Sequence, residues 1–133
     1  MRPLLFAALV SLFAFPALVE AQETKKIKRR TNVISVEEID QIRNEVSDAW
    51  ELVKRLRPRF LSARGVASFG NAASGRTTPY AKVVVDGVGR GELHTLRQIP
   101  VMHVIEVRYL SAADASTRYG TGYDGGAIEV KTR

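Results

Sequence analysis

The chain has 133 residues and no cysteine, so it is long enough for one domain and can hold neither disulfides nor thiolate metal sites. It carries 20 Lys and Arg residues against 14 Asp and Glu, a formal net charge of +6. Basic runs at residues 25–30 and 54–59 hold much of this excess. Such runs attract anionic lipids or nucleic acid, but a solvated tail and a basic helix end account for them more simply. We predict no nucleic-acid partner.

The N-terminus has the pattern of a secretory signal peptide. Arg2 precedes an apolar run over residues 4–15, Pro16 breaks the run, and Ala21 ends a small-residue cleavage motif. A membrane-spanning helix needs about 20 apolar residues, so this run is too short for an uncleaved anchor. We therefore expect export to the periplasm or the periplasmic face of the outer membrane, with no transmembrane segment after cleavage. The predicted division is a signal peptide at 1–21, a flexible basic leader (or a late-pairing first strand) at 22–32, and a folded domain at 33–133.

The strongest local pattern predicts one long amphipathic helix of about six turns, beginning after Ser35. Ser35 and Glu38 form a capping box, and Pro58 supplies the stop. Trp50 flanks an apolar stripe whose members recur at steps of three and four: Val36, Ile39, Ile42, Val46, Ala49, Val53 and Leu56. The other face carries the carboxylates Glu37, Glu38, Asp40, Glu45, Asp48 and Glu51. We expect these to form a solvated surface rather than a pair of catalytic acids.

Shorter elements are predicted in the middle of the chain. Residues 59–65 are typical of a short strand, and residues 66–80 are typical of a loop because they are rich in Gly, Ser, Ala and Thr. Val83 to Val85 form a buried strand, followed by a turn at Asp86 and Gly87. No further strand is expected before the next helical turns.

The last third of the chain alternates helical turns and strands. Leu93, Leu96 and Ile99 predict tight helical turns that Pro100 halts. Residues 104–110 predict a strand with Val104, Glu106 and Arg108 on one face and Ile105, Val107 and Tyr109 on the other. A short helix capped by Ser111 and ended by Gly120 comes next, and residues 126–133 form a final strand. The predicted fold is α/β (α+β), a four-stranded mixed sheet with one long amphipathic helix and two short helices.

The glycines near the C-terminus match a nucleotide-binding fingerprint in spacing only. Gly120, Gly122 and Gly125 spell G-x-G-x-x-G, but in a dinucleotide-binding fold that motif follows a strand and opens a helix. Here it follows a predicted helix and leads into a predicted strand. Gly87, Gly89 and Gly91 fail the same requirement. We therefore predict no nucleotide or other cofactor and interpret the C-terminal glycines as a tight turn.

The sequence offers few residues that could form a metal site or a catalytic site. His94 and His103 are the two histidines, nine residues apart, and a metal site would require distant carboxylates. Asp86 followed by Gly87 is first a turn signature. We predict no metal site, no catalytic residues and no enzyme activity. A small enzyme that uses Asp86, Glu106 or His94 is an alternative with no indicated reaction.

Taken together, the motifs in the C-terminal half resemble the plug domain of TonB-dependent outer-membrane receptors. In that family a strand ends in Asp-Gly-Val, a Leu/Ile-Pro turn precedes an Ile-Glu-Val strand, a small-residue helix ends in Tyr-Gly, and a Gly-rich turn opens a Gly-x-Ile-x-Val strand. The matching positions are Asp86, Gly87, Val88, Ile99, Pro100, Ile105, Glu106, Val107, Tyr119, Gly120, Gly125, Gly126, Ala127, Ile128 and Val130. The similarity extends more loosely upstream to Arg64 and Gly65, and so covers residues 33–133.

The resemblance implies a plug-like α/β domain in the envelope of a Gram-negative bacterium, related to transport. Family members continue into a barrel where this chain ends, at Arg133, and their TonB-binding segment is not recognisable in residues 22–32. The expected function is therefore a stand-alone, noncatalytic binding or interaction module whose partner is an outer-membrane β-barrel or another envelope protein, without contact to TonB. The loops Val66–Tyr80 and Gly120–Gly126 are the expected contact surfaces. The alternative is a split or remnant plug that fills a separately encoded barrel.

Overall fold

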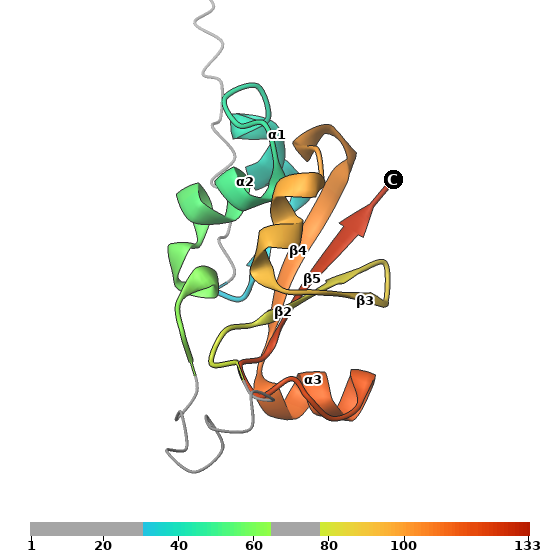
Figure 1. The fold of residues 1–133 in the computed structure, drawn as a ribbon. Coiled ribbons are helices and arrows are strands. Elements are labelled where there is room, and N and C mark those ends of the chain that lie inside the picture. The colour runs from blue at the N-terminus through green and yellow to red at the C-terminus, as the bar shows by residue number, and fades with distance from the viewer. Residues whose placement is uncertain (1–30, 65–77) are drawn as a thin grey trace, which may run out of the picture.

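The computed structural model describes residues 31–64 and 78–133, drawn in colour in Figure 1. The predicted signal peptide, most of the predicted leader, Gly65 and residues 66–77 of the predicted loop lie outside these ranges. The described residues form an α/β domain with a mixed five-stranded sheet, which confirms the predicted fold class. The predicted number of four strands is wrong.

The sheet has the strand order β1-β4-β5-β2-β3. β2 and β5 pair in parallel, and the other neighbours pair antiparallel. The predicted strands in the last third of the chain are confirmed, since β4 and β5 lie where the alternating patterns placed them. The strands span Val33–Ile34 (β1), Lys82–Val85 (β2), Val88–Gly91 (β3), Val104–Leu110 (β4) and Ala127–Thr132 (β5).

The turn predicted at Asp86 and Gly87 joins β2 to β3. Both residues have a positive φ, 50° and 84° respectively. This is the backbone that a two-residue hairpin requires, and Asp and Gly are among the few residues that adopt it readily. β3 follows at once as an exposed edge strand. It was not predicted, because its sequence VGRG has no alternation and too few strand-forming residues.

The predicted long helix is two helices, α1 (Val36–Ile42) and α2 (Ala49–Leu56). Asp48 is the N-cap residue of α2, and its carboxylate accepts a hydrogen bond from the Glu51 amide at 2.9 Å. The Ser47 amide donates to the Glu51 carboxylate at 2.9 Å. This reciprocal cap satisfies amide groups at the start of α2. Leu52, which the predicted stripe did not include, is fully buried beside Ala49 and Val53.

Arg43 holds the break between the two helices in place. Its guanidinium donates to the backbone carbonyls of Val101, Met102 and Val104 at 3.0 to 3.4 Å and pairs with Asp40 at 2.7 Å. These bonds attach the C-terminal end of α1 to the segment at residues 101–104, and the cap at Asp48 begins α2.

The strand predicted at residues 59–65 is also wrong. Residues Pro58–Leu61 form a 3-10 helix, η1, with Pro58 at its first position, where proline needs no hydrogen-bond partner. Phe60 is fully buried, and its ring stacks on that of Tyr109 at 5.3 Å. Burial of this one large side chain favours the turn over an extended segment.

The tight turns predicted around Leu93 form η3 (Leu93–Gln98), and Pro100 separates it from η4 (Val101–His103). β4 follows directly and has the predicted bounds. Its predicted faces are wrong at the start of the strand, where a bulge lies between Val104 and Glu106 and Val104 is fully buried in the main core. A bulge inserts one residue and so reverses the alternation on one side of it.

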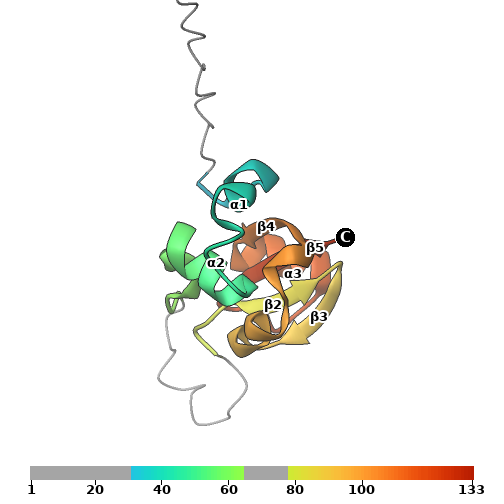
Figure 2. The same ribbon diagram turned by 90° about the horizontal axis from the view of Figure 1, so that it is seen from above.

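The two faces of the sheet are covered by different helices. Successive side chains of a strand point to opposite faces of the sheet. Val83, Val107, Ile128 and Val130 belong to the main core under α1 and α2, whereas Val84, Leu110 and Ala127 pack with Ala115 of α3 (Ala112–Tyr119). Figure 2 shows α1 and α2 along one side of the domain, away from the C-terminus.

The C-terminal glycines make the predicted turn from α3 into β5. α3 is capped by Ser111, whose hydroxyl accepts from the Asp114 amide, and ends at Gly120, both as predicted. Gly126 has a φ of 87°, and its amide donates to the Tyr123 carbonyl at 2.8 Å. A Cβ at Gly125 would overlap the Tyr80 carbonyl group and lie 2.9 Å from the Pro79 carbonyl carbon. These glycines allow two backbone segments to touch.

Candidate functional site

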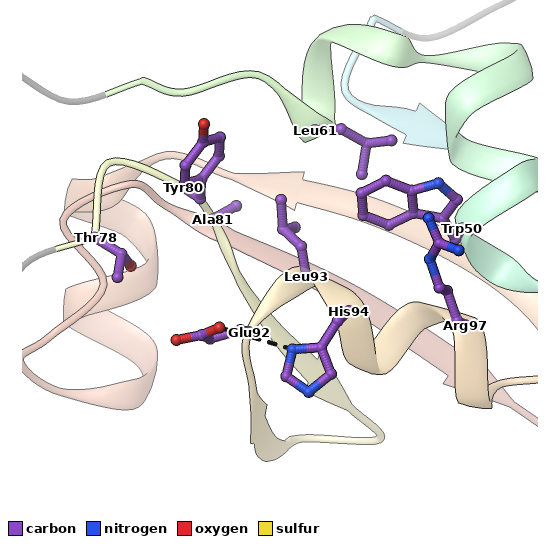
Figure 3. A pocket seen from close by; sticks show the side chains of 9 residues that line it. All are labelled: Trp50, Leu61, Thr78, Tyr80, Ala81, Glu92, Leu93, His94 and Arg97. Atoms are coloured by element: carbon purple, nitrogen blue, oxygen red, sulfur yellow. Dashed lines mark ion pairs between the residues drawn. The ribbon is translucent and has the colours of Figure 1, made fainter.

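A pocket of about 420 Å³ lies between α2, η1, the start of β2 and η3 (Figure 3). Its walls are apolar and aromatic: Trp50 comes from α2, Leu61 from η1, Tyr80 and Ala81 from the segment before β2, and Leu93 from η3. Thr78, Glu92, His94 and Arg97 complete the lining. Mostly apolar walls with a few polar groups are typical of a small-molecule site.

The pocket exists because three segments meet over the edge of the main core. Trp50, Leu61 and Leu93 are partly buried and pack against that core. The nearby Leu96 is fully buried and anchors η3, and the Ala49 amide donates to the Ile99 carbonyl at 2.9 Å, which ties α2 to the end of η3. These contacts fix the distance between α2 and η3, which form two walls of the pocket.

Charged groups occupy opposite ends of the pocket. The Arg97 guanidinium lies over the Trp50 ring, 4.9 Å from its centroid. Figure 3 shows this pair at one end, with Glu92 and Thr78 toward the other. The Glu92 carboxylate is 3.7 Å from His94 Nδ1, and both side chains are exposed. The pocket therefore has a cationic end and an end where a carboxylate faces an imidazole.

The two loops predicted as contact surfaces meet beside this pocket. The described part of the first loop, residues 78–80, lies against Gly125 in the second, as the close approach of Tyr80 shows. Tyr109 fixes the junction, since its hydroxyl donates to the Gly125 carbonyl at 2.9 Å. Tyr80 is 48% exposed and also lines the pocket. The pocket and the loop junction are therefore continuous.

Several of the plug-like motif positions hold the sheet together at its ends. Asp86 accepts hydrogen bonds from the Thr132 amide at 2.8 Å and the Thr132 hydroxyl at 2.6 Å, which join the β2–β3 turn to the end of β5. The hydroxyl bond and then the amide bond lower the pKa of the Asp86 carboxyl. Arg64 donates its amide to the Pro79 carbonyl at 2.7 Å, and its guanidinium lies 4.3 Å from the Tyr109 ring centroid. Val88 is exposed on β3.

The other motif positions lie in the core or in ion pairs. Ile99 packs against the main core, and the Pro100 carbonyl accepts from the His103 amide at 3.1 Å. Glu106 pairs with Arg108 and Lys131 at 3.1 Å each. The remaining positions share the sheet and its flanks: Ile105 is half-buried, Val107 and Ile128 are fully buried, and Tyr119 and Gly120 end α3.

A buried carboxylate that the sequence analysis did not single out lies under α3. Glu129 is 7% exposed, accepts from the Tyr119 hydroxyl at 2.8 Å and pairs with Arg118 at 3.3 Å. Burial, followed by the hydrogen bond to Glu129, raises the pKa of the Tyr119 hydroxyl. The arrangement attaches α3 to the sheet.

Glu38, predicted to be solvated, is buried instead. Its two carboxylate oxygens accept from one guanidinium nitrogen of Arg57 at 3.0 and 3.1 Å, and the two side chains are 4% and 10% exposed. Arg57 also donates to the carbonyls of Leu56 and Val33. This ion pair links α1, α2 and β1, and it replaces the expected polar surface at this position.

The residues proposed for an alternative enzyme belong to three separate sets of contacts. Asp86 is held by Thr132, Glu106 by two cations and His94 by Glu92. Within residues 31–64 and 78–133, no three His, Asp or Glu side chains gather as metal ligands would. In the same ranges no helix combines the length and apolar character needed to cross a membrane.

Comparison with known proteins found no match among protein-family models, curated proteins or solved structures. The pocket residues were also not singled out as a site from the sequence. Trp50 was noted beside the apolar stripe, His94 was one of two histidines and a candidate for the alternative enzyme, and Tyr80 ended a predicted contact loop. Arg97 carried no pattern. Their positions along the chain are far apart, and the packing of η3 against both α2 and β2 brings them together.

Proposed function

We propose that this chain is a noncatalytic binding module of the bacterial envelope, related to the plug domains of TonB-dependent receptors. The observation that carries the proposal is the continuity of the pocket with the junction of the two predicted contact loops, at Tyr80 and Gly125. Function on a rigid scaffold concentrates in such loops and clefts. The contacts around them, with Tyr109 at the centre, supply that rigidity.

The plug relationship rests on what the motif residues do. Asp86 closes the β2–β3 turn onto the end of β5, Gly125 and Gly126 allow the backbone of the last turn to approach its neighbours, and Ile128 fills the core. Structural roles of this kind are typical of residues that support a fold rather than a catalytic site. The location in the periplasm or at the outer membrane rests on the signal-peptide pattern of residues 1–21.

The test is affinity capture from envelope extracts of the source bacterium with the exported chain as bait. We expect saturable capture of one or a few envelope proteins, reduced when Tyr80 is replaced by Ala and unchanged when Arg90, on the exposed edge strand β3, is replaced by Gln. Recovery of a barrel protein would favour the alternative, in which the domain fills a separately encoded barrel. Recovery of TonB would show that the predicted absence of TonB contact is wrong. Equal background capture by all three baits would refute the proposed module.

A further inference from the structure

The lining of the pocket between α2 and η3 indicates the chemistry of a ligand. An engineered apolar cavity of about 150 Å³ binds benzene, so the 420 Å³ of this pocket can hold an aromatic ring and a short substituent. Trp50, Tyr80 and Leu93 line it with flat or apolar surface. Aromatic rings gain from offset or edge-to-face contacts with such walls, beyond the burial of area.

The cationic end of the pocket calls for an anionic group. Arg97 lies over the Trp50 ring and, among the residues that the structure describes, has no carboxylate partner. A guanidinium held on an aromatic face keeps its N–H edge available and matches a carboxylate in a two-bond geometry. Glu92 lies toward the other end, close to His94, and so does not compete for Arg97.

From this arrangement we infer that the pocket binds aromatic carboxylates, with the ring between Trp50, Tyr80 and Leu93 and the carboxylate on Arg97. The inference rests on the proposed function as a noncatalytic binding module and names the ligand class of that module. The same chemical group occurs in a free aromatic acid and in a peptide that ends in Phe or Tyr with a free carboxylate. In a peptide, the residues before the terminal Phe or Tyr must fit outside the pocket, whereas a free aromatic acid has no such residues.

The protein carries its own reporter, because Trp50 is the single tryptophan of the chain. Binding is measured as a saturable change in Trp50 fluorescence on titration with 3-phenylpropionate and with N-acetyl-glycyl-phenylalanine. The carboxamide of each compound is the neutral control. We expect each acid to bind about twofold to fivefold more tightly than its amide, since Arg97 is exposed and water and salt screen an ion pair at an exposed site. Binding of 3-phenylpropionate alone would assign free acids, and binding of both would include peptide termini.

Variants separate the two parts of the site. We expect Arg97→Gln to weaken binding of the acids about twofold to fivefold, which removes their preference over the amides, and to leave binding of the amides unchanged. Tyr80→Ala weakens acids and amides alike. Arg90→Gln, which removes an exposed cation outside the pocket lining, leaves all affinities as they were. Circular dichroism checks that each variant folds, and retained binding of the amide by Arg97→Gln is a second check.

Two results would overturn the inference: no saturable fluorescence change with either acid, or equal affinity of the Arg97→Gln variant and the unmodified protein for the acids. The fate of the ligand tests the proposed function separately. Recovery of unchanged 3-phenylpropionate after incubation agrees with a noncatalytic module. Its conversion would refute that function, while the binding inference would stand.

Discussion

Replacing Arg57 with Met would remove one half of a buried ion pair and leave the other half in place. The Glu38 carboxylate is 4% exposed, and its two oxygens accept hydrogen bonds from one guanidinium nitrogen of Arg57 at 3.0 and 3.1 Å. A carboxylate left in such a site without its cation costs about 3–5 kcal/mol. Arg57 also bonds the carbonyls of Leu56 and Val33, so its loss loosens β1 as well.

The chain contains a matched control for this change. Arg55 lies two residues earlier on α2 and pairs with Glu45 at 2.8 Å, but these side chains are 53% and 56% exposed. An exposed pair contributes about 0–1 kcal/mol because water and salt screen it. Both substitutions exchange Arg for Met at the C-terminal end of α2, where Arg55 lies in the last turn and Arg57 is the C-cap residue. The comparison is therefore between a buried arginine that also bonds backbone carbonyls and an exposed arginine with one ion pair.

The assay is urea unfolding followed by circular dichroism at neutral pH. We expect Arg57→Met to lower the free energy of unfolding by about 3–5 kcal/mol and Arg55→Met by less than about 1 kcal/mol. A domain of this size is stable by about 5–15 kcal/mol, so a loss at the upper end of this range can unfold it. Arg57→Lys then serves in its place, since it keeps the charge and loses only the planar guanidinium. Equal losses for the Arg55 and Arg57 variants would refute the argument from burial.

Three further predictions use the same unfolding measurement. Gly125→Ala forces the Tyr80 carbonyl to move and should destabilise the domain by more than Gly87→Ala. The Cβ of an alanine at position 87 meets open space, so that variant costs only the strain of its positive φ, about 1–2 kcal/mol. A larger loss for Gly87→Ala would contradict the close packing at Gly125. Because the Thr132 hydrogen bonds lower the pKa of Asp86 below its ordinary 3.8, the stability they add is present above that pH and is lost as the pH falls below it. The deficit of Asp86→Asn should therefore shrink between neutral pH and pH values below 3.8, and a deficit independent of pH would count against it. Arg43→Ala removes the guanidinium that bonds the carbonyls of residues 101, 102 and 104 and should lower the free energy of unfolding by about 1–3 kcal/mol, whereas Arg90→Ala, at an exposed residue, should change it by almost nothing. Similar values for both variants would show that the Arg43 contacts do not stabilise the domain.

Local sequence patterns predicted the elements whose boundaries depend on neighbouring residues. β4 and α3 were predicted within a residue, because alternation, the Ser111 cap and the stop at Gly120 act over one or two turns of chain. The helix break at residues 43–48 had a local signal as well, the second cap at Asp48 and Glu51. The apolar stripe continued across it at helical spacing and concealed it.

Errors arose where a distant contact decided the outcome. Glu38 has the pattern of a surface residue on an amphipathic helix, and only Arg57, 19 positions away, makes its burial tolerable. The segment at 59–65 has strand-forming residues, but Phe60 is buried against Tyr109, and this packing favours a 3-10 turn. Val104 is reversed by a bulge whose position depends on pairing with β5.

The sequence by itself determined the class of fold, the turn at Asp86 and Gly87, and the use of the C-terminal glycines as a turn into the last strand. Each of these follows from backbone preferences and periodicities that a short stretch of chain expresses alone. The tertiary structure alone decided that Trp50, Tyr80 and Arg97 form one pocket, and that Gly125 touches Tyr80. Residues from separate segments meet only where the chain folds back on itself, and no local preference encodes which of them will meet.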